Sequence, residues 1–134
     1  MCRIYPVLGY TVPLVAYPVS ETLGVSNPPD EPRLQWLTRP EMVTSAMRSQ
    51  IAQCWQEVSN AGGAVGFPFP PVGIDQVIDA TEEMVSSLDP LLRRVLVATV
   101  NEDLAGWLML SRNDTHLTAH WAFVQRVQTS LSFR

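Results

Sequence analysis

The sequence predicts a mixed α/β (α+β) domain in which a strand and two helices precede three consecutive strands. Two observations lead to this prediction. Apolar residues recur at helical spacing between residues 39 and 88. From residue 93 onward the pattern changes to β-branched segments separated by short turns. Three strands joined by short turns form an antiparallel meander, so we expect the order strand, helix, helix, strand, strand, strand.

Composition limits the domain count and the classes of partner. A chain of 134 residues forms one domain at most. Its formal net charge of −4 provides no general attraction to nucleic acid or to an anionic membrane. All nine basic residues are arginines. The absence of lysine from the sequence excludes catalysis by a lysine amine.

The cysteines predict neither a metal site nor a disulfide framework, and three of the tryptophans are predicted to be core residues. Cys2 and Cys54 are too few for either, so we expect no metal site. Cys54 falls within a helical pattern and is expected to be buried. Trp36, Trp55 and Trp107 are in phase with the predicted core faces. This cysteine usage fits a reducing, cytoplasmic setting.

The first 32 residues differ from the rest of the chain. They contain six of the eleven prolines, which disfavours a helix. Pro6, Pro13 and Pro18 interrupt the apolar stretch, so neither a secretion signal nor a membrane span is expected. We interpret 1–32 as a poorly ordered Pro-rich extension or an added edge strand. The folded unit is placed at 33–134.

Local signals set the predicted element boundaries. Thr38 and Glu41 match a capping box that would begin a helix over 39–59, and Asn60 or Gly62 could end it in a left-handed conformation. A Gly-, Pro- and Phe-rich loop covers 61–73. A second helix then begins at residue 74 and stops before Asp89-Pro90. Strands are predicted over 93–100, 104–112 and roughly 116–129.

Three stretches in this order resemble the first half of a Gcn5-related N-acetyltransferase (GNAT) domain. They are "CWQEVSNAGGAVGFPFPPV", "LVATVNEDLAGWLMLSR" and "HWAFVQRVQT". The resemblance covers about 33–134 and implies an incomplete GNAT-like fold whose full form has helices on both faces of the sheet. Acetyl-CoA would be the co-substrate and a small-molecule amine the acceptor.

The same resemblance assigns the cofactor residues. Val127, Gln128 and Thr129 correspond to the strand end whose backbone pairs with the pantetheine arm of acetyl-CoA. Arg134 matches the first residue of an R/Q-x-x-G-x-G/A loop, in which backbone N–H groups hold the pyrophosphate. The sequence has no glycine after Gly106, and Leu131 stands where the family often has proline. The alternative interpretation of 127–129 is an ordinary strand end without a ligand.

Candidate acid–base and acceptor-binding residues lie on three elements. His120, at the predicted start of the last strand, has a side chain that titrates in the range a general base needs. Glu57 lies late on the first helix and would hold or deprotonate an amine. Phe67 and Phe69 offer rigid apolar surface for an acceptor wall. Structural alternatives stay open for all of them: a surface His, a solvated Glu, and rings that fill the core beneath a loop.

Three functions remain in competition, and one of them is a small-ligand binder that uses the 61–73 loop as a wall without chemistry. The first is acetyl transfer by attack of the acceptor amine on the thioester, with the chain representing the N-terminal half of the enzyme and inactive alone. The second is a non-catalytic remnant or interaction module that associates through an exposed edge strand. In either of these two cases we expect self-association or pairing with a complementing C-terminal half, because the last strand would otherwise be an unpaired edge.

Overall fold

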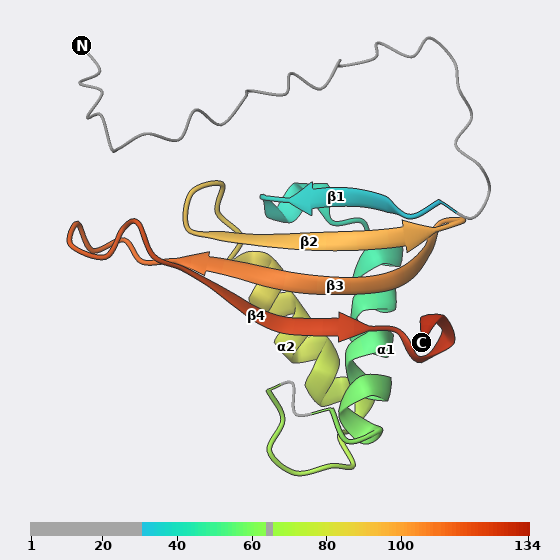
Figure 1. Cartoon of the computed structure of the whole chain (residues 1–134). Helices are drawn as coiled ribbons and strands as arrows, with labels where there is room; N and C mark the ends of the chain where they lie inside the picture. Colours follow the sequence, from blue (N-terminus) through green and yellow to red (C-terminus); the bar gives the residue numbers. More distant parts are fainter. Residues whose placement is uncertain (1–30, 64–65) are drawn as a thin grey trace, which may run out of the picture.

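The computed structural model describes residues 31–63 and 66–134, which form a four-stranded antiparallel sheet with two helices on one face (Figure 1). The sheet order is β1-β2-β3-β4. The predicted mixed α+β class with an antiparallel meander is confirmed. The expected extension at 1–32 lies almost entirely outside the described residues. The elements, in chain order, are β1 (Arg33–Leu37), η1 (Pro40–Met42), α1 (Ser45–Asn60), α2 (Ile74–Ser86), β2 (Arg93–Val100), β3 (Asp103–Arg112), β4 (Ala122–Thr129) and η2 (Leu131–Phe133).

Helix α1 begins six residues later than the capping-box pattern predicts. The N-cap is Thr44, whose hydroxyl accepts a hydrogen bond from the Met47 amide at 3.2 Å. The predicted cap, Thr38, instead donates to the sulfur of Met42 at 3.4 Å across the 3-10 turn η1. The prediction was wrong because the backbone becomes extended at Val43, with φ −96° and ψ 102°, and separates η1 from α1. At the other end, Gly62 takes the predicted left-handed conformation with φ +91°.

The turns between the last three strands determine where each strand begins. Strands β2 and β3 are joined at Asn101 and Glu102, which both have positive φ (51° and 71°), as in a tight hairpin turn. Strand β4 begins at Ala122 rather than near residue 116. The preceding residues are folded into turns by two hydrogen bonds, from Thr118 N to Thr115 O and from Trp121 N to Thr118 O.

The core lies between the helices and one face of the sheet. The fully buried side chains from the strands include Leu37, Val95 and Val97, and those from the helices include Ile51 and Val77. Neither helix in the described part of the chain has the length and apolarity needed to cross a membrane.

The three tryptophans assigned to the core from the sequence do not all lie there. Trp55 and Trp107 are buried, as the sequence predicts. Trp36 is 42% exposed, so its core assignment was wrong. It pairs with Leu96, next to the buried pair Leu37 and Val95, and neighbouring residues along a strand point to opposite faces of the sheet.

Candidate functional site at the end of β4

Strand β4 contains a β-bulge that begins three residues before its end. Trp107 pairs with Gln128 and Met109 pairs with Gln125, so Arg126 and Val127 both lie opposite the single residue Leu108. Arg126 is left-handed, with φ +54°, which costs a non-glycine residue on the order of 1 kcal/mol. Such bulges often occur beside binding sites, where they interrupt strand pairing.

Beyond the bulge, backbone groups of β4 face the free edge of the sheet. Ser130 donates its amide to Ala105 O at 2.9 Å. The carbonyl of Gln128 also faces β3, since a Cβ on Gly106 would lie 2.6 Å from that oxygen. Alternate residues of a strand direct their N–H and C=O groups to opposite sides. The Thr129 N–H shares a peptide group with the Gln128 carbonyl and therefore points away from β3, toward the edge that has no neighbouring strand.

The bulge places the Arg126 side chain on an aromatic cluster beneath the sheet. Its guanidinium carbon lies 4.5 Å from the centroid of the Trp55 ring. Trp55 also contacts Phe67, at 5.2 Å between centroids, and Trp107, at 5.3 Å. Burial lowers the pKa of Arg126, and the nearby charge of Arg93 acts in the same direction. This cluster fixes the side chains between α1, the 61–73 loop and β4.

Gln128 has its side chain on the buried side of the sheet. It is only 4% exposed, and neither Oε1 nor Nε2 has a hydrogen-bond partner among the described residues. A buried carboxamide without partners is costly, on the order of 1–3 kcal/mol. Its burial places the side chains of Val127 and Thr129 on the opposite face of the sheet, where both are exposed.

Three further residues meet where α1 passes the end of β4. Burial raises the pKa of the Cys54 thiol to about 11, and Glu57 adds to this rise. Arg134 and Trp107 act on the same thiol in the opposite direction. Arg134 also donates from Nε to the outward carbonyl of Thr129, at 3.3 Å. The structure thus brings the predicted residues Glu57, Gln128, Thr129 and Arg134 to one end of the sheet.

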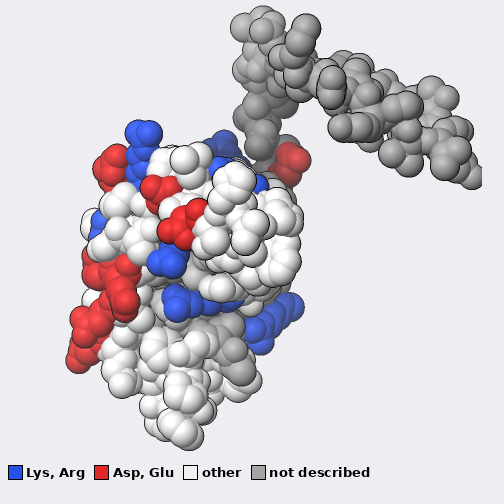
Figure 2. Space-filling view, turned by 90° about the vertical axis from the view of Figure 1, so that its left-hand side faces the viewer, with Lys and Arg blue, Asp and Glu red and all other residues white. Residues whose placement is uncertain are grey.

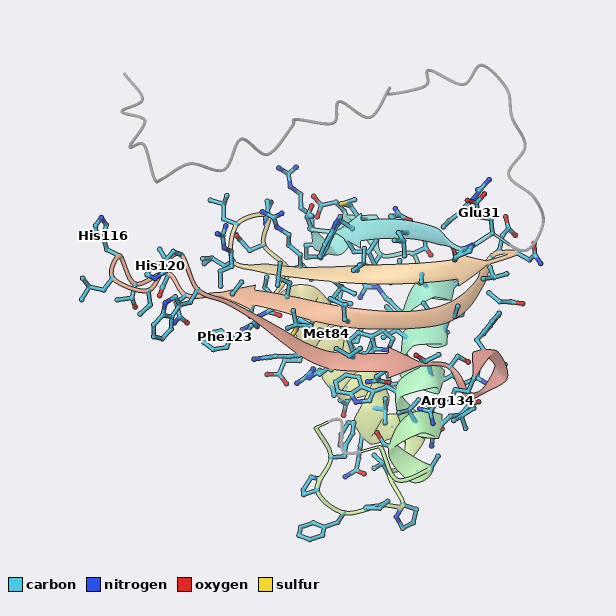
Figure 3. The ribbon with its side chains drawn as sticks, viewed as in Figure 1. Glu31, Met84, His116, His120, Phe123 and Arg134 are labelled. Carbon is cyan, nitrogen blue, oxygen red and sulfur yellow. The ribbon has the colours of Figure 1, made fainter. Side chains whose placement is uncertain are left out.

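The predicted histidine does not belong to this group. His120 is exposed in the connection between β3 and β4, with its ring 5.9 Å from that of Trp121. Figure 3 shows His116 and His120 at the end of the sheet opposite Arg134. The expectation that His120 begins the strand was wrong, because the turns at 115–121 occupy that position.

The two candidate phenylalanines have different environments. Phe67 packs on the core through Trp55, as the structural interpretation of the loop predicts. Phe69 is 85% exposed. Asn60 holds the end of their loop, because its side chain accepts from Val72 N at 2.7 Å and donates to Val72 O at 3.3 Å. Only Phe69 is therefore presented to solvent as a surface for a ligand.

Glu57 also borders a groove of about 750 Å³ between the outer sides of α1 and α2. It accepts a hydrogen bond from Gln53 Nε2 at 2.9 Å, one turn earlier on α1. Within residues 31–63 and 66–134, no three His, Cys, Asp or Glu side chains come together in a way that could hold a metal ion.

The sequence matches no protein-family model, and no curated protein matches it. Sequence reasoning also missed Arg126, the residue that forms the bulge and stacks on Trp55. A left-handed arginine has no local sequence signal. Gly106 was the available clue, since a glycine within a strand often marks a bulge or a close approach of two backbones.

Proposed function

We propose that this chain binds acetyl-CoA at the free edge of β4 and belongs to an N-acetyltransferase that acts on a small-molecule amine. The observation that carries the proposal is the bulge at Arg126, followed by the outward amide of Thr129. The pantetheine arm of coenzyme A contains two amide groups, so it can pair with a short backbone segment as an added strand does.

The length of the available edge favours a short ligand over a protein strand. The bulge interrupts β4 between Gln125 and Gln128, and bulges are one device that prevents sheets from pairing edge to edge. A long partner strand would have to match this irregular edge. A pantetheine arm needs only the last residues of β4, Val127–Thr129.

The charges nearby suit an acceptor amine and direct transfer. Glu57 places a half-buried carboxylate on α1, near the end of β4. In the proposed reaction the amine nitrogen attacks the thioester carbon, the new C–N bond forms, and the C–S bond breaks to release coenzyme A as its thiolate. The proton lost by the amine passes to Glu57 or water, and the thiolate is protonated from solvent. Cys54 is a poor nucleophile because its pKa is raised to about 11, so an acetylated cysteine is not part of the proposal.

Binding can be tested by thermal unfolding of the full chain with acetyl-CoA. A ligand at 100 times its Kd stabilises a protein by about 2.7 kcal/mol. For a domain of this size that stabilisation raises Tm by roughly 10 °C or more. An unchanged Tm at millimolar acetyl-CoA would overturn the proposal for this chain.

A backbone variant tests the location of the site. Thr129→Pro removes the outward amide without removing a hydrogen bond to β3, and proline is tolerated at an edge. We expect at least ten-fold weaker binding. The matched control, Thr129→Ala, keeps the amide and should bind as the wild type does. Equal binding by both variants would place the ligand elsewhere.

The second candidate function is an interaction module that uses the same edge. Phe123, Val124 and Val127 are 45%, 59% and 62% exposed on β4, which is the observation in its favour. Association that disappears in Thr129→Pro without any effect of acetyl-CoA would support this alternative.

A further inference from the structure

The face of the sheet opposite the helices carries apolar side chains and has no covering layer among the described residues (Figure 1). The strand register places Leu34, Trp36, Leu96 and Leu108 on this face. Leu34 is 69% exposed, and a depression of about 340 Å³ lies between β1 and η2. Four strands about 4.8 Å apart and about eight residues long give a projected face of roughly 500 Å². The apolar side chains occupy part of this face, and exposed apolar patches of a few hundred Å² are often functional.

The charges on this bare face are basic. Arg94 lies on the same side of the sheet as Leu96, and Arg112 on the same side as Leu110. Segments 93–98, 106–112 and 122–129 contain no Asp or Glu. The Nε of Arg94 is buried and has no hydrogen-bond partner among the described residues. The bare face therefore suits a partner that combines apolar side chains with carboxylates.

The chain presents such a surface on the outer side of α2. Ile74 and Ile78 are 40% and 44% exposed on the flank of this outer side that borders the groove between the two helices. Acidic side chains follow the same helix, and red side chains gather at the left of Figure 2, the side on which the helices lie. These exposed acidic residues are Asp75, Asp79, Glu82 and Glu83.

The spacing of the charges on the two surfaces is similar. Asp79 and Glu83 are four residues apart on α2, which separates them by about 6 Å. Arg94 pairs with Leu110, two residues from Arg112, so the two arginines are about 8 Å apart. Glu82 already binds Arg48, so Asp79 and Glu83 are the better candidates to contact the arginines.

We propose that copies of this chain associate head to tail, with the outer side of α2 in one copy covering the bare sheet face of the next. Each sheet would then have helices on both faces, a common arrangement of layers. The two surfaces differ, so the contact is heterologous and produces rings or open chains rather than a closed two-fold dimer. The inference does not depend on acetyl-CoA binding.

Charge reversal tests this arrangement by sedimentation velocity of the full chain. The wild type should form species larger than dimers as its concentration rises, and high salt should weaken them. Arg94→Glu/Arg112→Glu makes both surfaces acidic, and Asp79→Arg/Glu83→Arg makes both basic. Each double variant alone should associate at least ten-fold more weakly, whereas an equimolar mixture of the two should associate again.

Controls separate charge pairing from misfolding and from other contacts. Glu102→Arg, an exposed change in the β2–β3 turn at the other end of the sheet, should leave association unchanged. If Arg94→Glu disturbs the fold, the single variant Arg112→Glu replaces the double variant in the test. It changes only an exposed side chain, and it should still weaken association. A wild type that stays monomeric would overturn the proposal. Association that persists in Asp79→Arg/Glu83→Arg would also overturn it, because two sheet faces packed on each other would not need α2. Association that persists in all the variants would do the same.

Discussion

The guanidinium carbon of Arg126 lies 4.5 Å from the centroid of the Trp55 ring, although the Arg126 backbone is left-handed with φ +54°. A partly buried cation–π contact contributes about 1–2 kcal/mol. The left-handed backbone costs roughly 1 kcal/mol. The side-chain contact therefore offsets the strain at the bulge, and the two contributions can be separated by substitution.

Substitutions of Arg126 should rank in a specific order. Arg126→Ala loses the contact and keeps the strain, so we expect a loss of about 1–2 kcal/mol in the free energy of unfolding. Arg126→Gly also loses the contact but removes the strain, and should cost about 1 kcal/mol less than alanine. Urea unfolding measures both. A glycine variant less stable than the alanine variant would show that the bulge is not strained.

Gln128 predicts a substitution that stabilises the fold. Its buried carboxamide has no hydrogen-bond partner among the described residues, so Gln128→Leu should raise the free energy of unfolding by about 1–3 kcal/mol. Gln128→Glu, of similar shape, should lower it because it buries a charge. A destabilised leucine variant would mean that the carboxamide is hydrogen-bonded in solution. Acetyl-CoA binding by the leucine variant should stay close to that of the wild type, because the proposed pairing uses the neighbouring amide of Thr129.

Much of the fold follows from local sequence signals. The helical spacing of apolar residues correctly predicted that Cys54 and Trp55 are buried, and which side of α2 is apolar. The change of period predicted the bounds of β2 and β3 to within one residue. The errors arose where local signals compete with tertiary structure. The segment before Ala122 is rich in Thr and aromatic residues, which favour strands, but its backbone forms hydrogen-bonded turns.

The candidate site was predictable only in part. Glu57, Thr129 and Arg134 could be proposed from the resemblance, and the structure brings them to the same end of the sheet. The bulge at Arg126 could not be predicted, because the cost of a left-handed arginine is offset by Trp55, which lies 71 positions earlier in the chain. Contacts at such separation are not encoded in any local pattern.

Gly106 should tolerate no side chain. A Cβ at this position would lie 2.6 Å from Gln128 O, a backbone atom that cannot move without displacing β4. We expect Gly106→Ala to cost about 1–3 kcal/mol and to weaken acetyl-CoA binding. At Gly73, the atom closest to an added Cβ is 4.0 Å away, so Gly73→Ala should cost less than about 1 kcal/mol. Urea unfolding measures both variants. An equal loss in the free energy of unfolding for the two would contradict the close approach of β3 and β4.

Alkaline pH should destabilise the fold through Cys54. The pKa of this thiol is raised from 9.0 to about 11, chiefly by burial. Above pH 9 the unfolded chain therefore loses the thiol proton while the folded chain keeps it. The free energy of unfolding should fall by roughly 2 kcal/mol between pH 9 and 11 and then level off. The chain has no lysine, but its three tyrosines and Cys2 also titrate near this range, so the assignment to Cys54 needs a variant. Cys54→Ala should abolish the fall. An equal fall in Cys54→Ala, measured by urea unfolding at each pH, would show that another group is responsible.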